Sequence, residues 1–203
     1  MSKNLKLNIN RERLREAIVY FSKYLKYPTI TMMYKVLASL DFEHFKETGL
    51  PVTNLVYQAW KRGPVPYEFD KEISDRKNDC VLIPDDFASA LKCIKEEWET
   101  ENGQKRKSLK FHAKRKPNLE VFTPRQIKIL EEILFIYKNE TPSTASKASH
   151  EKDTPWYKNI QKKGKEGEII KYLDLLDDKS KITKEEAIEM VRELSAFQLN
   201  YGT

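Results

Sequence analysis

The spacing of apolar residues predicts two amphipathic helices at the start of the chain. Over residues 10–26 the apolar side chains recur at intervals of four, three and four, which places them on one stripe of a helix with 3.6 residues per turn. Residues 29–45 predict a second helix, with the inward positions Met32, Met33, Val36, Leu37 and Leu40. Pro28 separates the helices because the residue before a proline disfavours the helical conformation. Gly49 is typical of a helix C-terminus and ends the second one.

The pattern then changes to short extended and turn segments. Residues 55–61 are rich in β-branched and aromatic side chains and predict a strand. We expect residues 62–66 to form a rigid turn, because two prolines fix φ and remove two backbone donors. Pro66 favours the start of a short helix, and residues 79–83 predict a weaker strand. Residues 85–98 predict a further helix from the apolar positions Phe87, Leu91, Ile94 and Trp98.

Clear helix starts mark the second half of the chain. Thr123 is predicted as an N-cap, followed by a proline at the first helical position and by Gln126, which can complete a capping box. Similar starts predict helices after Thr141, Asp153 and Thr183. The last of these helices has the apolar stripe Ala187, Met190, Val191, Leu194 and Phe197. Short extended pieces are predicted over residues 109–111 and 120–122.

Together the elements predict a single, predominantly helical domain of the α+β class, with a small β element of short strands or a hairpin. A run rich in lysine and glycine, residues 162–167, predicts a link. It divides a body over residues 9–160 from a C-terminal helical extension over residues 168–200. We expect this extension to be packed on the body or flexibly linked to it. The length of 203 residues is enough for a hydrophobic core without disulfide bonds.

The positive charge is concentrated in one segment. The chain has 37 basic and 31 acidic residues, a net charge of +6. Residues 105–116 contain no acid and seven cations, Lys105, Arg106, Lys107, Lys110, Lys114, Arg115 and Lys116. Without them 30 basic residues face 31 acidic ones, so the rest has a net charge of −1. The segment could attract an acidic partner or phosphate, or pair with the acidic residues 96–101 across a turn as a solvated hairpin or loop.

Motifs for catalysis or cofactor binding are absent from the sequence. It contains neither a phosphate-binding glycine loop nor a nucleophile elbow. His44, His112 and His150 do not pair at a metal-ligand spacing. Cys80 and Cys93 are expected to be reduced thiols. We therefore expect no enzyme activity, cofactor or metal. The absence of an apolar leader and of a membrane-spanning run predicts a cytoplasmic protein that does not enter a membrane.

Three pieces of the sequence resemble one family. The first is residues 32–37, followed by the turn at residues 48–51. The second, residues 57–66, reads YQAWKRGPVP and is similar to an AW-x-x-GPV-x-P signature. The third comprises residues 146–151 and 155–158, with a Ser-rich helix, a histidine and a Pro-Trp pair. These pieces resemble the Panacea domain of SocA-like antitoxins, which occurs in bacterial toxin–antitoxin systems and in some phage-associated proteins, and the likeness extends over residues 14–175.

The resemblance implies an antitoxin that binds and neutralises a cognate protein toxin by direct contact. It implies that the body over residues 9–160 is a Panacea-like antitoxin domain. One branch of the family also resembles protease adaptors for the toxin, which implies a possible second role. Members pair with chemically unrelated toxins, so the resemblance identifies no particular toxin. It extends neither to the basic segment nor to the chain after residue 175.

The signature segment supplies the predicted partner-binding residues, which are Tyr57, Trp60, Lys61, Arg62, Gly63, Pro64, Val65, Pro66 and Tyr67. A stiff loop loses little entropy on binding, and Trp60 at the end of a strand can bury a large area. The preceding strand would also offer an edge that a partner could extend. The alternative interpretation is that Trp60 belongs to the core and that Gly63-Pro64 forms a corner.

The sequence is also compatible with a second class of function. The basic segment 105–116 and a helical fold are also typical of a nucleic-acid-binding regulator, and an antitoxin can repress its own promoter as well. A salt-dependent gel shift that is lost on neutralising Lys114, Arg115 and Lys116 would favour this alternative. An enzyme would require a concave pocket with a strongly shifted ionisable group.

Overall fold

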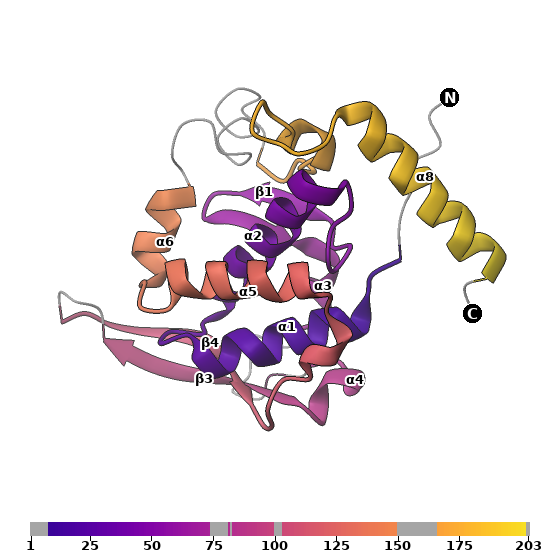
Figure 1. The fold of residues 1–203 in the computed structure, drawn as a ribbon. Coiled ribbons are helices and arrows are strands. Elements are labelled where there is room, and N and C mark those ends of the chain that lie inside the picture. The colour runs from indigo at the N-terminus through magenta and orange to yellow at the C-terminus, as the bar shows by residue number, and fades with distance from the viewer. Residues whose placement is uncertain (1–7, 74–80, 82, 100–102, 150–165, 202–203) are drawn as a thin grey trace.

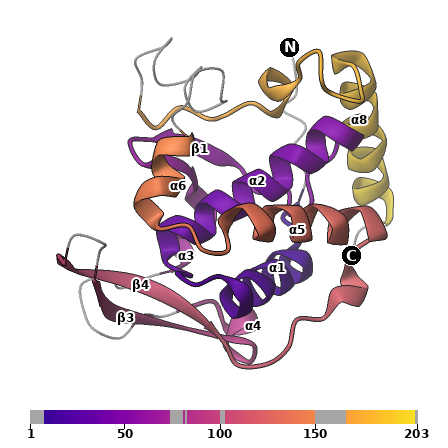
Figure 2. The ribbon, with the colours of Figure 1, turned by 60° about the vertical axis from the view of Figure 1, so that its left-hand side comes forward.

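Three helices form the centre of the molecule. The computed structural model describes residues 8–73, 81, 83–99, 103–149 and 166–201. Helices α1 (Arg11–Tyr24), α2 (Ile30–Thr48) and α5 (Pro124–Tyr137) pack against one another, and α2 also contacts several of the other elements (Figure 1). The view in Figure 2 shows α2 between α5 and the β1 strand. The predicted first two helices and the helix after Thr123 are therefore confirmed.

Polar caps fix the ends of these helices. The Oγ1 atom of Thr29 accepts a hydrogen bond from Met32 N at 3.3 Å, which caps α2. At the other end Gly49 has φ 76°, a left-handed conformation that favours glycine. Thr123 and Gln126 form the predicted capping box of α5, with both reciprocal hydrogen bonds present. These caps satisfy backbone groups that helix ends leave without partners.

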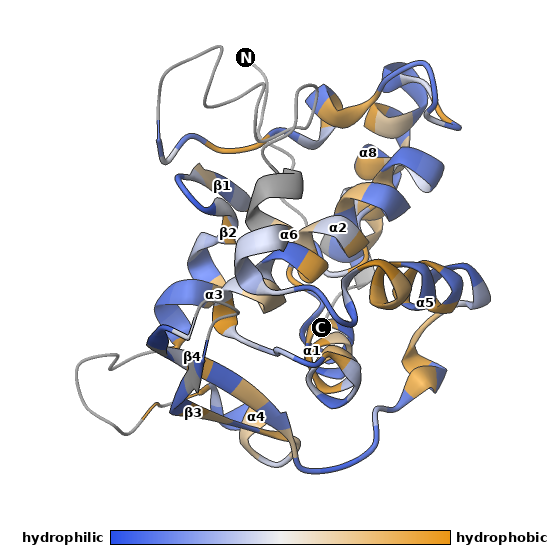
Figure 3. Cartoon of the chain, turned by 90° about the vertical axis from the view of Figure 1, so that its left-hand side faces the viewer, coloured by the Kyte–Doolittle hydropathy of each residue, from blue (hydrophilic) through white to orange (hydrophobic). Residues whose placement is uncertain are grey.

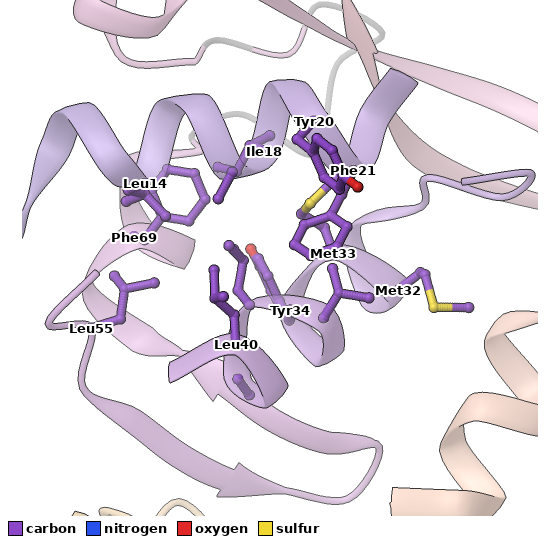
Figure 4. Close-up of a cluster of buried hydrophobic side chains, with 14 of the residues drawn as sticks. Leu14, Ile18, Tyr20, Phe21, Met32, Met33, Tyr34, Leu40, Leu55 and Phe69 are labelled. Atoms are coloured by element: carbon purple, nitrogen blue, oxygen red, sulfur yellow. The ribbon is translucent and has the colours of Figure 1, made fainter. Parts of the chain in front are cut away.

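The core lies between α1, α2 and the segments that follow them. Leu14, Ile18 and Phe21 of α1 face Met33 and Leu40 of α2 (Figure 4). Each of these five side chains is fully buried. Burial of one such side chain contributes about 1.5–3 kcal/mol to folding. The predicted inward stripes of both helices are thus the ones that the fold uses.

A short hairpin follows α2. Strand β1 (Tyr57–Trp60) pairs antiparallel with β2 (Gly63–Pro66), and a two-residue turn joins them. The prediction that residues 62–66 form only a turn was wrong, because most of that segment is a strand. The prolines are tolerated there because they alternate along the strand and leave the intervening residues to pair with β1. The short helix α3 (Tyr67–Glu72) begins after Pro66, as predicted.

A second, longer hairpin replaces the helix predicted over residues 85–98. Only α4 (Asp85–Ala88) is helical, and the chain continues as β3 (Leu91–Glu99), which pairs with β4 (Lys105–Ala113). Leu91 and Cys93 are buried, and Phe111 lies opposite Cys93. The segment therefore follows the two-residue alternation of buried and exposed side chains that is typical of a strand. The apolar spacing that suggested a helix was compatible with both structures. The hairpin extends away from the helices as an arm (Figures 1 and 2).

The remaining predictions have mixed outcomes. The extended piece predicted at residues 120–122 was wrong. The chain forms the 3-10 helix η1 (Leu119–Val121), since the Asn118 side chain accepts a hydrogen bond from Glu120 N at 3.1 Å. The predicted piece at residues 109–111 lies within β4, and α6 (Pro142–Ser149) is the helix predicted after Thr141. The helix expected after Asp153 lies outside the described residues, as does most of the strand predicted at 79–83.

The chain after residue 166 packs against β1 and α2. Ile170 and Leu175, the latter in the 3-10 helix η2 (Tyr172–Leu175), are 2% and 3% exposed. Helix α8 (Lys184–Tyr201) begins beside the end of α2, where Lys181 N donates to Lys46 O at 2.9 Å. Ala187 is buried there, but Met190 and Phe197 are 39% and 60% exposed. The predicted apolar stripe of this helix therefore contacts the rest of the molecule only in part.

The observed architecture confirms a helix-dominated α+β fold with two small antiparallel strand pairs. No helix in the described ranges combines the length and hydropathy that a membrane span requires.

Candidate functional site

The signature strand β1 lies in the middle of a small sheet. On one side it pairs with β2. On the other side Ala59 N donates to Glu168 O, Gly167 N donates to Ala59 O, and Ile170 N donates to Tyr57 O, each at 2.8 Å. A segment more than 100 residues further along the chain thus covers the edge of β1. The expectation that a partner could extend this strand was wrong, because the chain itself already does so.

The outer edge of β2 is also unsuited to strand addition. Pro64 lies opposite Ala59, and Pro66 lies opposite Tyr57. Ala59 and Tyr57 direct backbone groups toward residues 167–170, away from β2. Residues directly opposite each other in such a pair direct their backbone groups away from each other, so Pro64 and Pro66 direct theirs toward the outer edge of β2. As prolines, both lack an N–H group there. A partner strand would find no backbone donor at these two positions.

The inner face of the sheet belongs to the core. Four residues that were predicted to bind a partner are buried: Tyr57, Pro64 and Pro66 on this face, and Gly63 opposite Trp60 on the other face. Gly63 has φ 123°, a conformation that favours glycine, directly after the turn. The burial of Tyr57, Pro64 and Pro66 agrees with the corner interpretation. Their role is to hold the opposite face of the sheet in place.

A buried carboxylate on α2 anchors this inner face. Asp41 is fully buried and accepts hydrogen bonds from Val52 N at 2.8 Å, Thr53 N at 2.7 Å and Tyr57 Oη at 2.8 Å, as well as from the Thr53 hydroxyl. Desolvation raises the pKa of Asp41 to about 6, although these hydrogen bonds favour the ionised form. Asp41 therefore ties β1 and the loop before it to α2.

The outer face of the sheet is apolar and accessible. Trp60 is 41% exposed, and its Nε1 donates to Gln58 Oε1 at 3.1 Å. Gln58 pairs with Val65 on β2 and bridges to Ile169, which is 55% exposed. Cross-strand neighbours project to the same side of a sheet. Trp60, Val65 and Ile169 therefore surround Gln58, and these four residues are called the outer face below.

Two cations project from the turn beside the outer face. Lys61 and Arg62 are exposed, and the turn appears hydrophilic in Figure 3. Their backbone is held from two sides: Lys61 N donates to Glu166 Oε1, and Lys35 Nζ donates to Arg62 O, both at 2.8 Å. Lys35 lies on α2 and is only 3% exposed. Burial lowers the pKa of its ammonium group to about 8.

Tyr67, the last predicted partner-binding residue, lies at the start of α3. It is partly exposed, and Lys71 Nζ lies 3.9 Å from the centroid of its ring. This distance is within the range of a cation–π interaction. Tyr67 is therefore engaged with its own helix rather than with the outer face.

The basic segment 105–116 is largely paired with acidic residues and carbonyl groups. Lys107 lies 3.6 Å from Glu97 and Lys110 lies 3.2 Å from Glu96, both across the β3–β4 hairpin. Lys114 Nζ donates to Ala88 O at 2.6 Å. Lys105 and Lys116 are exposed, while the side chain of Arg106 lies outside the described residues. The hairpin interpretation, with opposite charges pairing across a turn, is therefore the one that this segment adopts.

Arg115 has a structural partner of its own. Its guanidinium group donates to both carboxylate oxygens of Glu16 on α1, at 2.7 and 2.5 Å. Burial opposes the ionisation of Glu16, but hydrogen bonds from Arg115, the Asn118 amide and Arg15 outweigh it and lower its pKa to about 2. The pair joins α1 to the chain after β4. Arg115 is thus committed to holding the fold.

Sequence reasoning missed five residues that shape this site, including Lys35 on α2. Gln58 gave no signal, and Ile169 and Glu166 lie far from the signature in the sequence. Asp41 did leave a signal, since it interrupts the apolar stripe of α2 between Leu37 and Phe45. A charged residue at such a position predicts a buried polar network.

Comparison with known proteins gives one match. The model of the family described as "Antitoxin SocA-like, Panacea domain" matches residues 33–157, from α2 to beyond α6. No curated protein and no solved structure matches the chain. The match covers more than half of the sequence and includes the signature hairpin. The chain therefore belongs to the Panacea-domain family of SocA-like antitoxins.

Proposed function

We propose that this protein is an antitoxin that binds a cognate protein toxin directly and neutralises it by covering a surface that the toxin needs. We propose further that the outer face and the turn beside it form the docking surface, and that the protein carries out no bond-making chemistry. Membership of an antitoxin family supports the general role. The observation that carries the assignment of the surface is the exposed Trp60 on a sheet that is held from behind by the core.

The chemistry of the outer face suits recognition of a protein. Tryptophan and arginine are enriched among the residues that dominate binding energy at protein interfaces, and Trp60 and Arg62 lie two residues apart here. Ile169 and Val65 extend the apolar contact area beside Trp60. Lys61 and Arg62 would attract a partner with carboxylates at the edge of its binding surface and would accelerate the encounter. We therefore propose that the toxin presents an apolar patch with an acidic border.

The proposal is tested with the protein encoded by the adjacent open reading frame. Co-expression of the wild-type chain should restore the growth of cells that express this neighbour, and the two purified proteins should form a complex. Trp60→Ser should weaken the complex about 30-fold or more, since truncation at the centre of an interface costs about 2 kcal/mol or more. Titration calorimetry measures the change.

A matched control separates the outer face from exposed aromatic surface in general. Phe197 is 60% exposed on α8, whose C-terminal half lies on the other side of the molecule from the β1–β2 turn (Figure 1). Phe197→Ser should therefore change the dissociation constant less than about threefold. An equal loss of affinity in Trp60→Ser and Phe197→Ser would show that the outer face is not the docking surface. Failure of the wild-type chain to bind or rescue would overturn the antitoxin role for this pair.

A further inference from the structure

We infer that Lys35 and Glu166 are positioning residues that fix the β1–β2 turn in its binding conformation before a partner arrives. This inference rests on the proposed function and adds a mechanism to it. The turn carries Lys61 and Arg62 and borders Trp60, so its conformation determines where three candidate contact residues point. Neither Lys35 nor Glu166 belongs to the signature segment itself.

The contacts hold the turn from both sides. Lys35 Nζ donates to the Arg62 carbonyl at 2.8 Å, and Glu166 Oε1 accepts from the Lys61 amide at 2.8 Å. One backbone acceptor and one backbone donor of the two-residue turn are thus engaged by charged groups, which form stronger hydrogen bonds than neutral ones. Lys35 comes from the N-terminal half of α2, and Glu166 lies directly before the segment that pairs with β1. The turn is therefore attached to two separate parts of the fold.

The burial of Lys35 is difficult to explain by stability alone. Lysine is almost never fully buried unless it is paired, and Lys35 is 3% exposed. Removing an ammonium group from water is costly, so a buried lysine is expected only where its donors are used. An apolar residue at this position of α2 would pack against the same neighbours but could not hold the Arg62 carbonyl. A lysine at this position therefore contributes a hydrogen bond that fixes the conformation of the turn.

A fixed turn has a direct consequence for binding. A loop that must be ordered on association loses conformational entropy at that moment, and this loss weakens the complex. A turn that is already ordered avoids the loss, so Trp60 and the two cations meet the partner in place. Removing either contact should therefore weaken binding without removing any residue of the docking surface.

The test begins with the isolated chain. Lys35→Met removes the ammonium group, Glu166→Ala removes the carboxylate, and Glu166→Gln retains an oxygen that can accept from the Lys61 amide. Lys128→Met is the matched control, because Lys128 is exposed on α5. NMR relaxation gives the order parameters of the Lys61, Arg62 and Gly63 amides. We expect values of about 0.85 in the wild type, the control and Glu166→Gln, and values below about 0.6 in Lys35→Met and Glu166→Ala.

Stability and affinity complete the comparison. The dissociation constant of Lys35→Met for the protein encoded by the adjacent open reading frame should rise about 5–20-fold, and the midpoint of thermal unfolding of the variant, measured beside it, shows whether the fold is retained. Glu166→Ala, an exposed substitution that leaves the core intact, should show the same pattern if Lys35→Met fails to fold. The inference would be overturned if the turn in Glu166→Ala and in folded Lys35→Met were as rigid as in the wild type. It would also be overturned if the turn became mobile and the affinity did not change. Absence of binding by the wild-type chain would count against the proposed function and would leave the relaxation result as the test of the turn.

Discussion

At the scale of single residues, buried carboxylates join parts of the chain that lie far apart in sequence. Glu16 connects α1 to the segment after β4, and Asp41 connects α2 to β1. Folding shifts the pKa values of the two carboxyl groups in opposite directions. Hydrogen bonds from cations and an amide outweigh burial at Glu16, whereas desolvation dominates at Asp41. They therefore affect stability with opposite dependence on pH.

The Glu16 contacts predict a loss of stability in acid. The pKa of Glu16 falls from 4.5 to about 2 on folding, so its contribution is present above pH 4.5 and is lost as the pH falls toward 2. The full contribution corresponds to about 3 kcal/mol. Glu16→Gln should lower the free energy of unfolding at pH 7 and flatten its slope between pH 5 and pH 2. Urea unfolding across this range measures both. Parallel pH profiles for the variant and the wild type would contradict the account.

At the scale of elements, the contact between α2 and α8 depends on a glycine. An added Cβ atom at Gly49 would lie 2.9 Å from Ile182 Cδ1 and 3.1 Å from both Ala187 Cα and Met190 Sδ. Gly49 also has a φ of 76°. Helix α8 therefore packs where the end of α2 offers no side chain.

This packing predicts different effects for two glycine substitutions. Gly49→Ala should lower the free energy of unfolding by about 2–3 kcal/mol, because left-handed strain adds to a steric clash. Gly167→Ala is the matched control, since Gly167 has a φ of 90° but no atom within 4 Å of an added Cβ. It should cost only about 1 kcal/mol. Chemical denaturation measures both, and equal losses would mean that α8 does not press on Gly49.

The β3–β4 arm shows why one element was predicted wrongly. Leu91 and Ile94 fit the spacing of a helix, but Leu91 and Cys93 also fit that of a strand. The segment becomes a strand because residues 105–113 pair with it. Local propensity takes no account of such a distant partner. The same pairing places Glu97 and Glu96 against two of the seven cations of the basic segment, Lys107 and Lys110.

Charge pairing in the arm predicts weak binding to DNA. Lys107, Lys110 and Arg115 lie against carboxylates, so few counterions would be released when the arm meets a phosphate backbone. We expect no retardation of duplex DNA in a gel-shift assay at about 150 mM salt. Retardation that disappears when Lys114, Arg115 and Lys116 are neutralised would instead favour the nucleic-acid-binding regulator.

At the scale of the whole molecule, the sequence predicts most of the helices and part of the proposed docking surface. Strong caps such as Thr123 and clear stripes such as that of α1 are local signals, and they were sufficient. The signature placed Trp60, Lys61 and Arg62 correctly on an accessible surface. The signature alone does not show which of its residues are exposed and which are buried, because that depends on which face of the sheet packs on α2.

The missing part of the surface comes from distant sequence. Ile169 and Glu166 lie beyond residues 33–157, the range of the family match, yet they complete the outer face and hold its turn. A contact between segments more than 100 residues apart leaves no periodic signal in either one. Such contacts are determined by the packing of the whole chain and become visible only in three dimensions.

The central claim is that the outer face docks onto a protein toxin. Hydrogen exchange of the chain, alone and in complex with the protein encoded by the adjacent open reading frame, tests it most directly. We predict slower exchange in the complex for the amides of residues 58–63, 65 and 167–170, and unchanged exchange in α8. Protection confined to α8 or to the β3–β4 arm, with exchange at the outer face unaltered, would contradict the account.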